Sequence, residues 1–350
     1  MNDELIMTLP IKPQQKIKIG LCVAPLLTEV LKNTTSTKNI IAVNLLNTYD
    51  KKDEFLKTYL QKLKDLDISS DELFIDKDNI DILMDCIEEM IDLNIIIEKE
   101  CDIYRCECGR VDTVSHSLRT YDANTLYYEK DGKYYCKVCN NELKIQKQKN
   151  LFIHLDEDAN TSIQIFPNHF KNSCINFDKQ FKGMDYLVSK NRDTGYKINH
   201  NGTIYNIDID ALWMNYINCF SNKSEIIVAS NHQIFEMYLI NYLNRMYKNK
   251  DLHFLATPYL VTKDRTIESR FDEMRALESK LNLLFSLKWK NPDSTYNINA
   301  MDYISKLSDA QLLELYDIIN MEVSGNDIDD TVKKVVLDNI NYQKVLKRRK

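Results

Sequence analysis

Glycine is scarce in this sequence, with seven residues in 350. A P-loop needs two glycines that flank four residues and precede Lys-Ser or Lys-Thr, and a dinucleotide-binding fingerprint needs three glycines close together. Neither pattern occurs in the chain. The sequence therefore speaks against P-loop ATPases, GTPases and the usual NAD-dependent enzymes.

Long apolar runs and a surplus of basic charge are also missing. No apolar run approaches the roughly 20 residues that a helix needs to cross a bilayer, and the first ten residues lack the basic segment of a secretory signal. The formal net charge is -6, so contact with nucleic acid would depend on local basic patches. We expect no membrane contact and a cytoplasmic location.

The chain contains nine cysteines and no secretory signal. Nine is an uneven number, so the cysteines cannot all pair as disulfides within the chain. This count indicates a reducing compartment with free thiols or a metal site. Five of the cysteines fall between residues 101 and 139, and the other four are scattered among apolar neighbours, where we expect them to pack as small apolar residues: Cys22, Cys86, Cys174 and Cys219.

Two close thiol pairs are the strongest chemical signal. Cys106-Glu-Cys108-Gly109 is followed by Cys136-Lys-Val-Cys139. Each short turn presents both sulfurs to one side, so the pairs can converge on one tetrahedral Zn²⁺. Four thiolates fill the ligand shell, and the predicted zinc is therefore structural rather than catalytic.

The surroundings of these cysteines leave alternatives open. His116 is an alternative ligand, Cys101 is a spare thiol, and unligated cysteines are the plainest interpretation. Tyrosine pairs on either side of Asp131-Gly132 predict a small hairpin between the two thiol pairs.

The rest of the chain alternates strand and helix patterns. Apolar spacing predicts a β-α-β-α-α order for the first hundred residues, which is typical of an α/β architecture. The predicted strands cover 16–21, 39–46, parts of 151–165, 203–208, 225–230 and 254–261. The predicted helices begin near Pro25 and cover 53–66, 80–97, 209–214, 234–247 and much of the chain from 266 onward, with polar breaks at 70–73 and 76–81.

Polar residues at two strand ends are candidates for ligand binding. Gly20 lies at a strand-to-helix turn, where phosphate is favoured. Asn231, His232 and Gln233 follow a buried strand, at the edge where open α/β sheets bind ligands. Ordinary turns are the alternative at both places, with Ser230 or Asn231 as a helix N-cap.

A charged segment after the last predicted strand contains Lys263, Arg265 and Arg270. These three cations can contact phosphate. A solvated loop that enters a helix is the alternative interpretation.

The order of these pieces resembles the catalytic core of class I aminoacyl-tRNA synthetases. In that family a His-Ile-Gly-His motif, a cysteine-bearing insertion, a Glu-Asp-His-type strand end and a Lys-Met-Ser-Lys-Ser loop follow one another. Lys18-Ile19-Gly20-Leu21 takes the first place here, Asn231-His232-Gln233 the third and 265–270 the last. The resemblance covers residues 15–300, and the cysteine spacing is similar to the glutamyl and methionyl-like branches.

The resemblance implies a fold and a set of roles. The fold would be a Rossmann-like parallel sheet, with its first half at 1–100, a zinc-binding insertion at 101–150, its second half at 151–262 and a degenerate loop with a helical part at 263–350. It implies catalytic roles for Lys18 and Arg265, binding of ATP with Mg²⁺ by Gly20, Lys263 and Arg270, and binding of an amino acid or small amine by Asn231, His232 and Gln233.

Departures from the family motifs leave the activity open. Lys18 and Leu21 replace both histidines of the first motif, and Glu268 places a negative charge in the last one. We also expect no anticodon-binding domain, because only 80 residues follow Arg270. We therefore expect an enzyme that activates or transfers an amino acid outside ordinary translation. A non-catalytic pseudo-synthetase that binds tRNA or a protein is the first alternative, and an unrelated α/β protein with a zinc knuckle is the second.

Three local basic sets are candidates for contact with a tRNA acceptor end. Solvated surface lysines are the alternative interpretation of all three. The sets are Lys144, Lys147 and Lys149 beside the cysteines, Lys280, Lys288 and Lys290 in the predicted helical part, and 347–350 at the end of the chain.

Overall fold

A six-stranded parallel sheet forms the core of the molecule. The computed structural model describes residues 4–35, 37–46, 52–118, 125–156, 162–166, 168–190 and 196–257. The strand order is β3-β2-β1-β13-β14-β9, and all five neighbouring pairs run parallel. These strands are β1 (Glu4–Thr8), β2 (Lys38–Val43), β3 (Glu72–Ile75), β9 (Gln164–Phe166), β13 (Ser224–Ser230) and β14 (Asp251–Thr257). The predicted α/β fold with a Rossmann-like sheet is confirmed.

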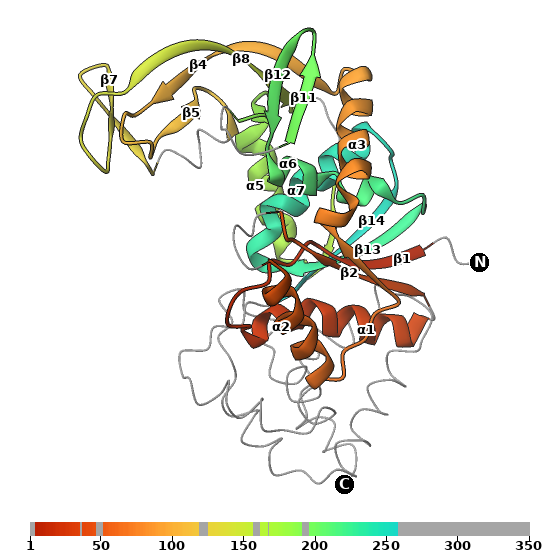
Figure 1. The fold of residues 1–350 in the computed structure, drawn as a ribbon. Helices are drawn as coiled ribbons and strands as arrows, with labels where there is room; N and C mark the ends of the chain where they lie inside the picture. Colours follow the sequence, from red (N-terminus) through yellow and green to blue (C-terminus); the bar gives the residue numbers. More distant parts are fainter. Residues whose placement is uncertain are drawn as a thin grey trace.

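Helices cover both faces of this sheet (Figure 1). On one face, η1 (Ile19–Cys22), α1 (Val23–Thr35) and α2 (Lys52–Asp65) pack in one apolar cluster. A larger cluster on the other face involves α3 (Ile80–Asp92), α5 (Phe170–Phe181), α6 (Ile209–Met214) and α7 (Ile234–Met246). Strands between two such layers need apolar residues on both sides, which explains the continuous apolar runs of β2 and β13.

The first strand is not where the sequence predicts it. The strand predicted at 16–21 is wrong, because Ile19–Cys22 is a 3₁₀ turn and β1 is the first strand. β1 pairs with β2 on one side and β13 on the other, and its central residues are buried on both faces. Lys16 and Lys18 are exposed. Their alternation with isoleucines suits a half-buried strand, but a central parallel strand requires a fully apolar segment.

The boundaries of β3 and α3 also differ from the prediction. The polar break at 70–73 runs into β3, an edge strand of the sheet that needs few apolar residues. The helix predicted to reach residue 97 ends at Asp92. Asn94 adopts a left-handed conformation with φ 57°, and the Ile95 N–H donates to the Met90 carbonyl at 2.9 Å. A left-handed residue with this hydrogen bond is typical of a helix C-terminus, and it reverses the chain direction before β4 begins.

A long antiparallel ribbon carries the cysteine segment away from the parallel sheet (Figure 1). Its two strands, β4 (Ile96–Arg105) and β8 (Lys144–His154), are joined by ten register pairs, and β5 (Asp112–Val114) and β10 (Asp185–Leu187) flank them. The predicted hairpin is confirmed near the far end of the ribbon. It consists of β6 (Tyr127–Lys130) and β7 (Lys133–Cys136), and both of its turn residues, Asp131 and Gly132, have positive φ.

From residue 203 onward the described elements follow the predicted order, whereas α5, β10 and β11 (Tyr196–His200) lie in a segment for which the sequence predicts no element. A hairpin of β11 and β12 (Thr203–Ile207) leads into α6, and β13 leads through η4 (Asn231–Gln233) into α7. The predicted helical part from 263 onward lies outside the described residues. Of the helices within the described ranges, none is both long enough and apolar enough to cross a bilayer.

Candidate functional site

The four cysteines of the predicted metal site converge. Their sulfurs all lie within 4.8 Å of one another. The Sγ atoms are 3.3 Å apart for Cys106 and Cys139 and 3.6 Å apart for Cys108 and Cys136. Cys106 directly follows β4 and Cys136 ends β7, so the two strand ends bring the pairs together. Gly109 has φ 71° and donates its N–H to the Cys106 carbonyl at 3.0 Å, which makes the first turn as tight as predicted.

This arrangement can hold a tetrahedral metal ion. Four sulfurs about 2.3 Å from a central ion lie about 3.8 Å from one another, which is close to the separations found. Burial opposes ionisation of the Cys136 thiol. The N–H groups of Cys139 and Val138 and the neighbouring thiols nevertheless lower its pKa to about 7. Burial and the neighbouring thiols raise the pKa of Cys106, another member of the tetrad, to about 12. A metal binds the thiolate form, so a bound cation would favour ionisation of all four cysteines.

The two alternatives near the tetrad lie outside it. His116 lines a separate polar cavity of about 300 Å³ between β4 and its neighbours. Cys101 Sγ donates to the Gln148 carbonyl at 3.2 Å. Among the described residues, the one group of side chains that could hold a metal ion consists of the four predicted cysteines.

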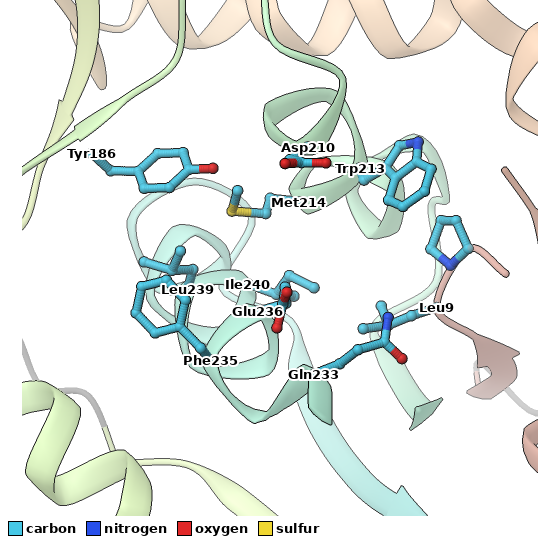
Figure 2. Close-up of a pocket in the computed structure, with 11 residues that line it drawn as sticks. Leu9, Tyr186, Asp210, Trp213, Met214, Gln233, Phe235, Glu236, Leu239 and Ile240 are labelled. Atoms are coloured by element: carbon cyan, nitrogen blue, oxygen red, sulfur yellow. The ribbon is translucent and has the colours of Figure 1, made fainter. Parts of the chain in front are cut away.

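A pocket of about 140 Å³ lies at the carboxyl ends of β1 and β13 (Figure 2). Leu9 and Pro10 follow β1 and form one side, and the Leu9 N–H donates to the Val228 carbonyl at 3.1 Å. β1 continues into α1 on one face of the sheet and β13 into α7 on the other. The pocket therefore lies at the topological switch point, where open α/β sheets bind ligands. The other lining residues are Tyr186, Asp210, Trp213, Met214, Gln233, Phe235, Glu236, Leu239 and Ile240.

The pocket combines apolar walls with negative charge. Asp210 is half-buried and Glu236 is exposed, and the described residues of the lining include no lysine, arginine or histidine. The Tyr186 hydroxyl points toward Asp210 in Figure 2. Apolar walls with a few placed polar groups are typical of small-molecule sites. This pocket suits a compact apolar group that carries an ammonium.

A buried carboxylate, Asp76, supports one wall of the pocket. It accepts hydrogen bonds from Trp213 Nε1 at 3.1 Å and from the backbone N–H groups of Leu45 and Leu46 at 2.7 and 3.3 Å. Burial raises the pKa of Asp76, and these N–H groups oppose the rise. Asp76 thus ties the carboxyl ends of β2 and β3 to α6. The sequence placed it in a polar break, and its position directly after a strand was the available signal.

Gln233 is the predicted substrate residue that the structure brings to the pocket. Asn231 and His232 belong to the same 3₁₀ turn but are not among the lining residues. The predicted N-cap also exists. Ser230 Oγ accepts from the His232 N–H at 3.2 Å, and Gln233 Oε1 accepts from the Ser230 N–H at 3.2 Å. This capping box fixes the Gln233 side chain at the edge of the pocket.

Lys18 and Gly20 lie where the chain enters α1. Lys18 is the exposed N-cap of η1, and Gly20 is the second residue of that turn. α1 follows β1, so this turn is on the carboxyl side of the sheet. Contact with phosphate stays a prediction for both residues. The three predicted cations of the last motif, Lys263, Arg265 and Arg270, lie outside the described residues.

The first predicted basic set is paired with carboxylates along the ribbon. Lys144 Nζ lies 2.6 Å from Glu107, Lys147 Nζ 3.5 Å from Glu100 and Lys149 Nζ 2.7 Å from Glu98. Exposed pairs contribute little stability, but each one cancels a positive charge locally. RNA contact at this surface would therefore require the pairs to open. The other two basic sets lie outside the described residues.

No protein-family model matches the sequence, and no curated protein is significantly similar to it. The fold, in contrast, is similar to that of solved methionyl-tRNA synthetases, so the resemblance seen in the sequence is confirmed at the level of the fold.

The similar solved structures include methionyl-tRNA synthetase of Mycobacterium tuberculosis. The free enzyme has 14% identity and a TM-score of 0.64, and the match covers 97% of this chain and 79% of that chain. A structure bound by methionyl-adenylate has 12% identity and a TM-score of 0.63, with 96% and 81% covered. A second methionyl-adenylate complex has 13% identity and a TM-score of 0.58, with 93% and 72% covered. At these identities the likeness establishes the fold.

Replacement of Asp76 by alanine should destabilise the protein and disturb Trp213. The Leu45 N–H and the Trp213 indole N–H would lose their acceptor, and a buried donor without a partner costs about 1–3 kcal/mol. Denaturant unfolding measures the loss, and tryptophan fluorescence in a Trp289→Phe background reports on Trp213 alone. Asp78→Ala is the matched control, because Asp78 is exposed in the same turn. Equal stability of the two variants would contradict the supporting role of Asp76.

Proposed function

We propose that this chain activates or transfers an amino acid, by adenylate or aminoacyl chemistry, outside ordinary translation. The pocket at the carboxyl ends of β1 and β13 is the observation that carries the proposal, since it combines the switch-point position with apolar walls and negative charge. The synthetase-like fold supports it, because the similar structures include enzymes bound by methionyl-adenylate.

Each described residue of the site has a part in this proposal. The apolar walls hold the substrate side chain, and Asp210 and Glu236 attract its ammonium group. ATP with Mg²⁺ would supply the adenylate group. Lys18 would face its phosphates from the start of η1, and Gly20 would let them approach a helix N-terminus. Gln233 would orient the amino acid or small amine through its fixed carboxamide.

The alternative is a non-catalytic pseudo-synthetase that binds tRNA or a protein partner. Leu21 favours this alternative. Its side chain packs against the apolar cluster around α1 and has no polar group for a phosphate. The two carboxylates of the pocket would also repel a triphosphate placed close to them.

Exchange of radiolabelled pyrophosphate into ATP separates the two candidates. The full chain is assayed with each of the twenty amino acids, with and without total tRNA. Exchange with one amino acid, or with one amino acid only in the presence of tRNA, is expected for the enzyme. The absence of exchange in every mixture would reject adenylate formation. Transfer of a radiolabelled amino acid from aminoacyl-tRNA to a small amine then tests aminoacyl transfer, and its absence as well would leave the binding role. A tRNA acceptor end as partner and a cytoplasmic location belong to the same proposal.

Lys18→Ala should weaken ATP binding by about 1.5–3 kcal/mol, the contribution of a charge-assisted hydrogen bond. Isothermal titration calorimetry of the variant measures this loss. Lys12→Ala is the control, because Lys12 is an exposed lysine of the same loop. If wild type and Lys18→Ala bind ATP equally, the placement of the phosphates near η1 is wrong.

Zn²⁺ is the metal that we propose for the cysteine tetrad, because four thiolates in a tetrahedral arrangement are typical of structural zinc sites. Purified protein should contain about one Zn²⁺ per chain. Cys136→Ser should release it and make residues 101–145 susceptible to protease, while the parallel sheet stays folded. Elemental analysis and limited proteolysis check both effects.

Cys101→Ser is the control for the zinc prediction. Cys101 lies on the same ribbon but outside the tetrad, so its replacement should leave the metal content unchanged. Freshly reduced wild-type protein without zinc would contradict the proposal.

A further inference from the structure

Two thiols outside the metal site face each other where α3 packs against the turn that follows α6. Cys86 lies on α3, and Cys219 ends η3 (Tyr216–Cys219), the turn that follows α6. Their Sγ atoms are 3.9 Å apart. All nine cysteines belong to the described residues, and the other sulfur–sulfur contacts found there are those within the tetrad. Cys86 and Cys219 are therefore a second thiol pair, 133 residues apart in sequence.

A buried ion pair holds the turn that carries Cys219. Lys250 Nζ lies 2.6 Å from Glu225 Oε1, and the two side chains are 6% and 0% exposed. The same ammonium donates to the carbonyls of Ile217 at 2.6 Å and Phe220 at 2.7 Å, on either side of Cys219. A turn fixed at both ends keeps its sulfur directed at α3.

The contact between the two sulfurs favours a thiolate at Cys86. A hydrogen bond with the Cys219 thiol is the main cause that lowers the pKa of Cys86. Burial opposes this shift, the Lys248 ammonium adds to it, and the carboxylates of Glu89 and Asp85 oppose it. The same contact raises the pKa of Cys219. One sulfur of the pair thus ionises more easily than an isolated buried thiol, and the thiolate is the reactive form.

We infer that Cys86 and Cys219 are a modification site, at which a small-molecule disulfide such as oxidised glutathione produces a reversible protein disulfide. One cysteine attacks the reagent as a thiolate, forms a mixed disulfide and expels one glutathione thiolate. The other cysteine loses its proton to solvent, attacks the first sulfur and expels the second glutathione. The protein gives up two protons and two electrons, and the reagent becomes two glutathione molecules. This inference is independent of the proposed function.

The disulfide would act on the pocket through α6. A disulfide requires a sulfur separation of about 2.05 Å, so its formation would draw the two sulfurs together from 3.9 Å and pull η3 toward α3. η3 continues directly from α6, which carries Asp210 and Trp213. Asn215 Nδ2 also donates to the Ala211 carbonyl at 2.9 Å and links the two elements. A shift of η3 is therefore passed to the pocket wall.

Incubation of the full-length, metal-loaded protein with glutathione disulfide tests the inference. Mass spectrometry of the denatured, alkylated protein should show the loss of two alkylatable thiols, and non-reducing peptide mapping should join the Cys86 and Cys219 peptides. Dithiothreitol should reverse both changes. In a Trp289→Phe background, oxidation should change the emission of Trp213.

Variants assign the effect to the pair. Cys86→Ser and Cys219→Ser should each abolish the crosslink and the change in emission. Cys174→Ser should retain both, because Cys174 is a buried cysteine of α5 without a sulfur neighbour. The peptide map of wild-type protein needs no variant to fold. A crosslink between other cysteines, or persistence of both free thiols in glutathione disulfide, would overturn the site. A crosslink without any change in Trp213 emission would overturn its coupling to the pocket.

Discussion

The rest of the structure depends on the pairing of β1 with two strands from distant parts of the chain. Ile6 faces Asn39 of β2 on one side and Ile226 of β13 on the other. Parallel pairing brings the carboxyl ends of these strands to one edge, and the crossovers to α1 and α7 leave on opposite faces. The pocket is the space that this divergence leaves open. Burial of each large apolar side chain of β1 contributes about 1.5–3 kcal/mol, so a strand of five residues is sufficient.

The cysteine segment, unlike the parallel sheet, has too small an apolar core to be stabilised by burial alone. Its buried apolar cluster contains six residues, and two of these are the predicted metal ligands Cys106 and Cys136. Tyr104 and Tyr134 stack with their ring centroids 4.6 Å apart, which adds apolar contact to this cluster. So small a core seldom folds on its own. A metal bound by the tetrad would replace the missing core and fix the end of the ribbon.

The sequence predicts the parts of this protein in which local pattern and environment agree. β2, β13 and α7 have apolar spacing that matches their burial, and the thiol pairs and the Asp131-Gly132 turn have spacing that few other structures produce. β1 was missed because a short apolar segment near the N-terminus has no periodicity, whereas the lysine–isoleucine alternation before Gly20 does. β3 was missed because an edge strand needs few apolar residues.

The pocket shows why a site is harder to predict than a fold. Gln233 was found because it follows a strand, which is a local signal. Asp76, Tyr186 and Trp213 come from three separate segments, and only the packed structure brings Asp76 to the Trp213 indole. Contacts of this kind depend on tertiary distance and leave no spacing in the sequence. The same holds for Cys86 and Cys219, which looked like ordinary apolar filler.

The register between β1 and β13 has a consequence for the order of folding. Glu4 pairs with Ser224, so the centre of the sheet cannot close until most of the chain exists. At a synthesis rate of about 5–20 residues per second, β1 waits roughly 10–45 s on the ribosome with one edge open. Contacts of such sequence separation form slowly, and an open edge of buried strand is a template for wrong pairing. We therefore expect the folding yield to depend on how well β1 is kept from wrong pairing until β13 has been synthesised.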